Sequence, residues 1–142
     1  MIMKTVDCEI IEWFEHDKRH VHIKLGMYVR AYVRQTRRTR FRGDYHGKYA
    51  REYVQNQADL RDVLNLEMKK AKVEKFGKVQ LGCAISVFGP KAHRSDLGNL
   101  EKAVEDAANG SVWVDDRWVY QRGAGRKQKA KEDSMELRVW EL

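Results

Sequence analysis

The chain has 142 residues, which is enough for one domain with a moderate core but too few for two. It carries 28 Lys and Arg against 21 Asp and Glu, and the formal net charge of +7 favours a polyanionic partner. The sequence has no run of about 18 apolar residues and no apolar signal core, so we expect a cytoplasmic protein without a membrane span. Cys8 and Cys83 match no metal-ligand spacing and are expected to be reduced, buried thiols.

The first half of the chain predicts a hairpin followed by a long helix. Residues 8–14 and 21–33 are rich in β-branched and aromatic residues, and the polar segment HDKRH separates them. From about residue 45 to residue 73, apolar and aromatic residues recur at four-residue spacing, as they do on one face of a helix.

Basic residues concentrate between this hairpin and this helix. Over residues 30–51 Asp44 is the only acid, and tyrosines and Phe41 lie among the arginines. Guanidinium groups match the geometry of phosphate oxygens, so the segment predicts nucleic-acid contact, although a solvated loop kept soluble by arginine is the alternative. The residues that we expect to contact DNA are Arg34, Arg37, Arg38, Arg40, Arg42, Lys48, Arg94, Arg126 and Lys127.

The second half predicts a strand at 78–88, a helix from residue 97, a strand within 112–121, a loop, and a last strand at 135–142. At 100° per residue, one face of this helix is apolar and must meet the sheet, whereas Glu101 and Glu105 are expected to point to solvent. Asp96 stands at the N-cap, where its carboxylate can accept backbone N–H bonds. The apolar face consists of Leu97, Leu100, Val104, Ala107 and Ala108.

Carboxylates gather around this helix. Asp96 opens it, and Asp115 and Asp116 stand after it, so short connections make their convergence plausible. Hard cations such as Mg²⁺ prefer oxygen ligands, and Lys102 could add a positive charge beside a phosphate. Each element also has a structural interpretation: an N-cap, a surface salt bridge between Lys102 and Asp106, and a turn at the paired aspartates.

Residues 94–119, RSDLGNLEKAVEDAANGSVWVDDRWV, resemble the core motif of the RusA-type Holliday junction resolvases. Weaker likeness extends to the arginine-rich segment and to the order of strands and helices. The residues at the spacing of the family motif are Asp96, Asn99, Lys102, Asp106, Asp115 and Asp116.

The resemblance implies an α/β (α+β) fold with a small mixed β-sheet and two main helices packed on it, in a single domain over residues 1–142 that works as a homodimer. It also implies Mg²⁺-dependent hydrolysis of phosphodiesters in a four-way DNA junction, with Mn²⁺ able to substitute. In a phage-encoded protein this would take place in the host cytoplasm. The implied catalytic residues are Asp96, Lys102, Asp115 and Asp116, the implied metal ligands are the three aspartates of this set, and Asn99 and Asp106 support them.

Gly98 departs from the family pattern, which usually has a second aspartate there. Three alternatives follow: a site that functions with three aspartates, a site that is completed by another carboxylate such as Asp106, or a protein that only binds branched DNA. The rival hypothesis is therefore a non-catalytic DNA- or RNA-binding dimer. A ribosome-associated protein would leave the paired aspartates unexplained, and His20 and His22, which share a strand face, are more typical of surface histidines than of a metal site.

Overall fold

The computed structural model describes residues 6–32 and 48–142, so Arg34, Arg37, Arg38, Arg40 and Arg42 lie outside the described residues. The elements are β1 (Cys8–Glu15), β2 (Lys18–Leu25), α2 (Lys48–Lys70), β3 (Leu81–Gly89), the 3₁₀ turn η2 (Ala92–Arg94), α3 (Leu97–Ala108), the 3₁₀ turn η3 (Asp116–Trp118), β4 (Val119–Arg122), β5 (Lys127–Lys129) and β6 (Ser134–Glu141).

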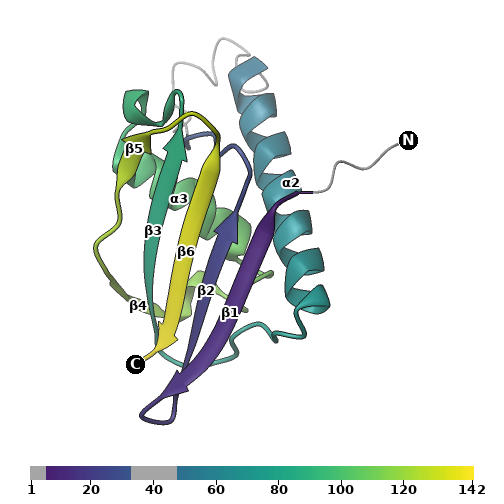
Figure 1. The fold of residues 1–142 in the computed structure, drawn as a ribbon, viewed down its shortest axis with the longest axis vertical. Helices are drawn as coiled ribbons and strands as arrows, with labels where there is room; N and C mark the ends of the chain where they lie inside the picture. Colours follow the sequence, from purple (N-terminus) through teal and green to yellow (C-terminus); the bar gives the residue numbers. More distant parts are fainter. Residues whose placement is uncertain (1–5, 33–47) are drawn as a thin grey trace.

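The strands form one mixed sheet in the order β1-β2-β6-β3-β4, and β5 also pairs with β3 (Figure 1). The β1-β2, β2-β6 and β6-β3 pairs are antiparallel, whereas β4 and β5 run parallel to β3. The last strand of the chain therefore lies in the middle of the sheet, between β2 and β3. The expected α+β fold, a small mixed sheet with two main helices, is confirmed.

The predicted hairpin is present, with its turn at His16 and Asp17, whose φ angles are 52° and 63°. Two consecutive residues with positive φ are what a tight hairpin turn with the twist of β-strands requires. The second strand is shorter than the predicted 21–33, because the chain leaves the sheet after Leu25. The Gly26 N–H then bonds to the Asp7 carbonyl oxygen, beside the start of β1.

The core lies between one face of the sheet and the two helices, which Figure 1 shows on the same side. Alternate residues of the three central strands face this core in matched rows: Val21 pairs with Val139, which in turn pairs with Cys83. Helices α2 and α3 contribute apolar stripes to the same cluster, which includes Leu64 and Val104. Period-2 burial on strands and period-3.6 burial on helices thus meet in one core.

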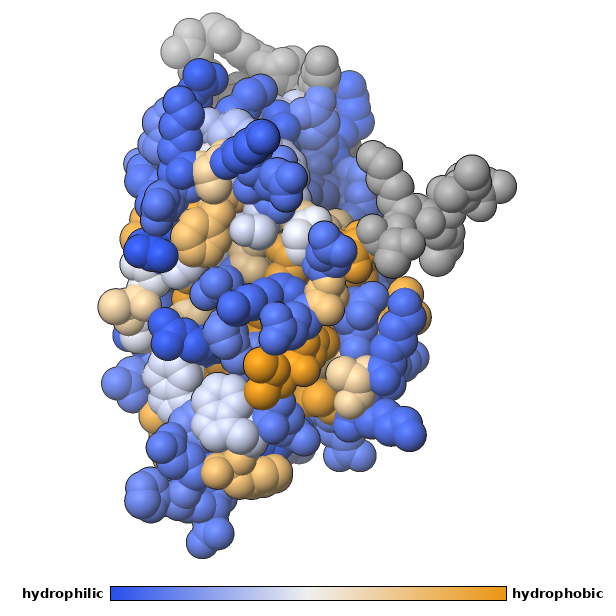
Figure 2. All heavy atoms as spheres, in the orientation of Figure 1, coloured by the Kyte–Doolittle hydropathy of each residue, from blue (hydrophilic) through white to orange (hydrophobic). Residues whose placement is uncertain are grey.

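The opposite face of the sheet is not covered by a helix. Figure 2 shows it as largely hydrophilic, with an apolar area over β1, the strand that carries the exposed Ile11 and Trp13. His20 and His22 lie on this face at 3.7 Å from Glu15 and 3.6 Å from Glu136, respectively. In the described parts of the chain, no helix is long and apolar enough to cross a membrane.

The two cysteines differ from each other. Cys83 is buried in β3, as predicted, but Cys8 is only half-buried because β1 is the edge strand of the sheet. Burial raises the pKa of the Cys83 thiol to about 12 and that of Cys8 to about 11. Both thiols are free.

Two predictions for the second half were wrong in detail. The predicted strand within 112–121 begins only at Val119, because Val112 and Trp113 turn into the core and are fully buried there. The segment after it was predicted to be a loop, but Lys127–Lys129 pairs with the end of β3 as β5. This strand lies at an exposed edge of the sheet and consists of charged and polar residues, so its sequence lacks the apolar alternation that predicts a strand.

Candidate active site

Helix α3 presents its N-terminus beside the segment that follows β3. Asp96 occupies the N-cap position, as predicted, and its carbonyl oxygen accepts bonds from the N–H groups of Asn99 and Leu100. Its carboxylate, however, makes no capping bond, so the predicted side-chain cap was wrong. Lys127 holds this start in place, because its Nζ donates to the Ser95 carbonyl oxygen at 2.7 Å. Among residues 6–32 and 48–142, no side chain pairs with the exposed Asp96 carboxylate.

The paired aspartates have opposite environments. Asp115 accepts the Arg117 N–H at 3.0 Å and its guanidinium at 3.1 Å, and these bonds hold the pKa of the Asp115 carboxyl below its ordinary value. This aspartate caps the turn η3, which agrees with the structural interpretation of the pair. Asp116 is less exposed, and its Oδ1 accepts the indole N–H of Trp113 at 2.7 Å.

Burial raises the pKa of Asp116 above its ordinary value, and the negative charges of Asp106, Glu105 and Asp115 add to this rise. The indole hydrogen bond from Trp113 opposes these effects but does not outweigh them. Asp116 thus lies among like charges, and a cation bound near them would stabilise its ionised carboxylate.

Asp106 links α3 to α2. Its Oδ2 accepts the Tyr53 hydroxyl at 3.0 Å, and its Oδ1 lies 3.5 Å from the Lys102 Nζ. Burial, followed by the nearby charge of Asp106, raises the pKa of Tyr53. Lys102 also lies 4.9 Å from the centre of the Tyr32 ring. The predicted salt bridge between Lys102 and Asp106 is therefore present, and it lies next to Tyr32 and Tyr53.

Glu105 was predicted to point to solvent, and this was wrong. Its side chain binds Arg122 of β4 through two bonds of 2.5 and 2.6 Å, and only 8% of the residue is exposed. Glu105 lies next to the buried face of α3, and the Arg122 side chain covers its carboxylate. The hydrogen bonds and the charge of Glu105 raise the pKa of Arg122, whose side chain is 64% exposed.

Gly98 opens into a small cavity of about 190 Å³. A Cβ atom placed on Gly98 would meet nothing within 4 Å. The remaining residues that line the cavity carry two acids and two bases, namely Glu101, Lys102, Glu105 and Arg122. The position that lacks the usual aspartate therefore has space for one and faces charged side chains.

The predicted acids are brought together only in part. Asp116 lies within electrostatic range of Asp106 and Glu105, in the second half of α3. Ten residues of helical rise place Asp96 about 15 Å from Asp106 along the axis. Within residues 6–32 and 48–142, no three His, Cys, Asp or Glu side chains stand close enough to hold a metal ion. The carboxylates thus fit Mg²⁺ by their chemistry but not by their placement.

Four of the predicted DNA-contact residues lie in the described part of the chain, at or next to the start of α2, the turn η2 and β5, which Figure 1 shows at one end of the fold. Arg94 ends the turn η2, and the guanidinium of Arg126 lies 5.5 Å from the centre of the Phe88 ring. Lys127 has a positioning contact to Ser95, and Lys48 begins α2, where its side chain is not described. Asn99 accepts the Tyr32 N–H through its carbonyl oxygen at 3.0 Å.

Three residues of this site were missed from the sequence. Glu105 and Arg122 form an ion pair across 17 residues, and Tyr53 binds Asp106 across 53. The spacing of Gly98, Glu101 and Glu105 on one helix was a usable signal, because residues three and four apart are neighbours on a helix. Nothing in the sequence pairs Tyr53 or Arg122 with α3.

A basic surface attracts a polyanion, and carboxylates can hold the metal ions that act on phosphodiesters, so a basic α+β domain with acids along one helix is compatible with an enzyme that cleaves nucleic acid. Residues 26–140 match the family of the endodeoxyribonuclease RusA, over most of the chain. The protein therefore belongs to the RusA endodeoxyribonuclease family, a family of hydrolases that act on branched DNA junctions. No curated protein matches the chain closely enough to count as a relative.

Proposed function

We propose that this protein is a Mg²⁺-dependent, structure-specific endodeoxyribonuclease that resolves four-way DNA junctions in the cytoplasm, with Mn²⁺ as a substitute for Mg²⁺. Two subunits of a homodimer would each hydrolyse one phosphodiester. The observation that carries the proposal is the family match over residues 26–140. The net charge of +7 and the acids around α3 support it.

Within this proposal, Asp116 is the central carboxylate, because burial and then the neighbouring acids disfavour its ionised form, and a bound cation would stabilise that form. Lys102 could contact a phosphate bound near Asp116. Its side chain is half-exposed, and it lies 3.5 Å from Asp106, an acid whose charge acts on Asp116. Arg122 neutralises Glu105 beside the cavity at Gly98. Asp96 and Asp115 are the other expected ligands of a divalent cation, which would supply charge stabilisation at the phosphate. Because Asp96 stands about 15 Å along α3 from Asp106, a shared site would require the start of α3 to move toward η3.

The direct test is cleavage of a synthetic four-way junction with and without Mg²⁺. We expect paired nicks in opposed strands that depend on the metal, and no cleavage of a linear duplex of the same sequence. Cleavage that continues in excess chelator would contradict the metal dependence. Equal cleavage of the linear duplex would contradict the structure specificity.

A second candidate function is a non-catalytic dimer that binds branched DNA or RNA. Gly98 and the placement of Asp96 away from Asp116 favour it, because neither helps to close a metal site. This protein would bind the junction in the same assay and leave every strand intact in Mg²⁺ and in Mn²⁺.

Replacing Arg37, Arg38 and Arg40 by alanine is expected to weaken binding to all DNA. By counterion release, each lost phosphate contact should reduce the slope of log affinity against log salt by about 0.9. Titrations of one labelled junction at several salt concentrations measure this slope.

The matched control replaces Lys69 and Lys70, in the last turn of α2, and Lys72, just after it, which changes the net charge equally. A slope that falls as much in the control as in the arginine variant would show that only net charge matters. An unchanged slope in the arginine variant would place the DNA elsewhere on the protein.

A further inference from the structure

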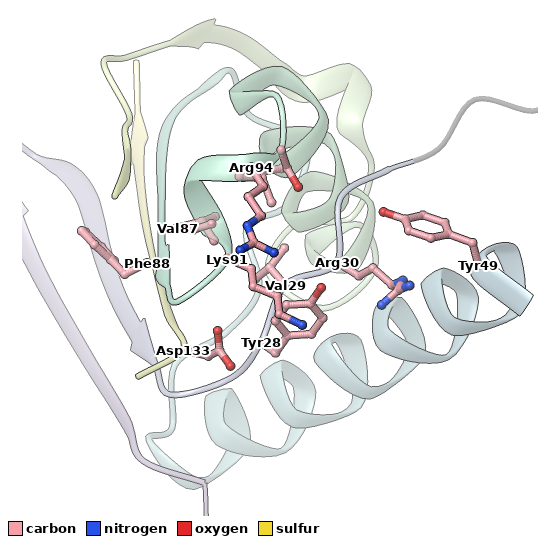
Figure 3. A pocket seen from close by; sticks show the side chains of 12 residues that line it. Tyr28, Val29, Arg30, Tyr49, Val87, Phe88, Lys91, Arg94 and Asp133 are labelled. Carbon is pink, nitrogen blue, oxygen red and sulfur yellow. The ribbon is translucent and has the colours of Figure 1, made fainter. Parts of the chain in front are cut away.

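A second cavity, of about 250 Å³, lies where the chain after β2, the start of α2 and the segment before α3 meet (Figure 3). Residues 28–30 and Tyr49 line one side, and Lys91, Arg94 and Ser95 line another. Because Ser95 precedes Asp96, this cavity adjoins the N-terminus of α3. None of the acids of the candidate active site lines it.

Positive charge predominates in the lining. Arg30, Lys91 and Arg94 face a single acid, Asp133. Figure 3 shows Lys91 and Arg94 directed toward the opening that Tyr28 lines. Among the described residues, the side chains of Lys91 and Arg94 have no hydrogen-bond or ion-pair partner, so both are available to an anion.

Arg30 is held more firmly. Its guanidinium binds Glu52 at 2.5 Å and lies 4.1 Å from the centre of the Tyr49 ring. The Tyr49 hydroxyl in turn donates to the Ala31 carbonyl oxygen at 3.4 Å. The buried Nε of Arg30 has no partner in the part of the chain that the structure describes. One wall of the cavity is therefore held in place before any ligand binds.

Tyr28 supplies an open aromatic surface. It is 41% exposed, and Asn56 fixes its backbone by donating to its carbonyl oxygen at 2.8 Å. An exposed ring on a fixed backbone is a platform on which a nucleic-acid base can stack, and stacking of this kind tolerates any base. The cavity is smaller than the sites of drug-sized ligands and too small for a base pair in a duplex.

We propose that this cavity binds one unpaired nucleotide of DNA, with the base stacked on Tyr28 and the adjoining phosphate held by Lys91 and Arg94. This rests on the proposed function, since the crossover of a junction is where bases can leave their pairs. Holding a base out of its pair costs a few kcal/mol, which stacking and phosphate contacts offset. The bound nucleotide would lie next to Asp96, at the start of α3.

The test uses single-stranded DNA rather than cleavage. A short labelled oligodeoxynucleotide is compared with the same oligonucleotide carrying a central abasic residue, which keeps the phosphates and removes one base. The wild-type protein should bind the intact strand about 5- to 150-fold more tightly, the range expected for one stacked base. Tyr28→Ala should abolish this difference, whereas Tyr28→Phe should retain it.

Lys91→Ala and Arg94→Ala should weaken binding of both strands equally and reduce the single-strand salt slope by about 0.7 each. Phe14→Ala, an exposed aromatic on the β1 hairpin, and Lys69→Ala, at the far end of α2, are the matched controls. Wild-type protein that binds both strands equally would overturn the proposal, as would a base preference that survives in Tyr28→Ala. A base preference in a protein that cuts no junction would support the cavity and contradict only the proposed function.

Discussion

Asp116→Asn is expected to reduce junction cleavage below about one hundredth of the wild-type rate, the scale of losing one electrostatic catalytic group. Binding should be unchanged or tighter, because a negative charge beside the phosphates is lost. Asparagine can still accept the Trp113 indole N–H through its amide oxygen, so the local packing should survive. Single-turnover cleavage and a binding titration on the same junction measure the two effects.

The control for this variant is Asp59→Asn on α2, which removes the same charge from an exposed carboxylate outside the site. It should cut at the wild-type rate. If Asp116→Asn also cuts at that rate, Asp116 is not part of the active site.

The metal-free Asp116→Asn variant should also melt at a higher temperature than the wild type near neutral pH. The folded protein raises the pKa of Asp116, so its ionised form is disfavoured by folding. This cost is absent below the unfolded pKa, where the carboxyl is protonated in both states, and it develops as the pH rises through the folded pKa. Melting curves from acid to neutral pH should therefore diverge with rising pH, and a gap that is constant with pH would contradict the assignment.

Gly98→Asp is expected to lower the Mg²⁺ concentration needed for half-maximal cleavage. The new carboxylate would enter an open cavity beside Glu101 and Glu105, and it would stand near the positive end of the α3 dipole. Position 98 lies between Asp96 and the acids in the second half of α3. A carboxylate there would partly fill the gap between them and add a ligand for the cation. Cleavage rates across a Mg²⁺ titration measure this, and the rise in melting temperature with Mg²⁺ measures it without catalysis.

Gly98→Ala is the matched control, because it also fills the position with a Cβ atom but adds no ligand. It should raise stability by about 0.5–1 kcal/mol, since glycine costs that much inside a helix, and leave the Mg²⁺ requirement unchanged. If Gly98→Asp lowers cleavage while Gly98→Ala does not, Lys102, Arg122 and their partner acids already form a site that a further carboxylate disrupts.

Local patterns were sufficient to predict most of the elements. The short apolar run in residues 81–89 indicates a strand that is buried along nearly its whole length, and the apolar stripe of residues 97–108 indicates a helix with one buried face, so both elements follow from short windows. The same reasoning misplaced β4 because Val112 and Trp113 look like strand residues but pack as a turn into the core. It missed β5 because Lys127–Lys129 has an edge-strand composition with no apolar alternation.

The amino-acid sequence by itself determined the family, through the spacing of Asp96, Lys102 and Asp116, and the basic character that suits DNA. Only the tertiary structure decided which charged groups meet. Asp116 stands with Asp106 and Glu105, whereas Asp96 lies at the other end of α3. Pairings such as Glu105 with Arg122 join the helix α3 to the strand β4, which are separate segments of the chain. The spacing of residues along a chain indicates helix faces and turns. Contacts between distant charged residues depend instead on how the sheet brings separate segments together. The residues that determine this arrangement are spread over the whole core.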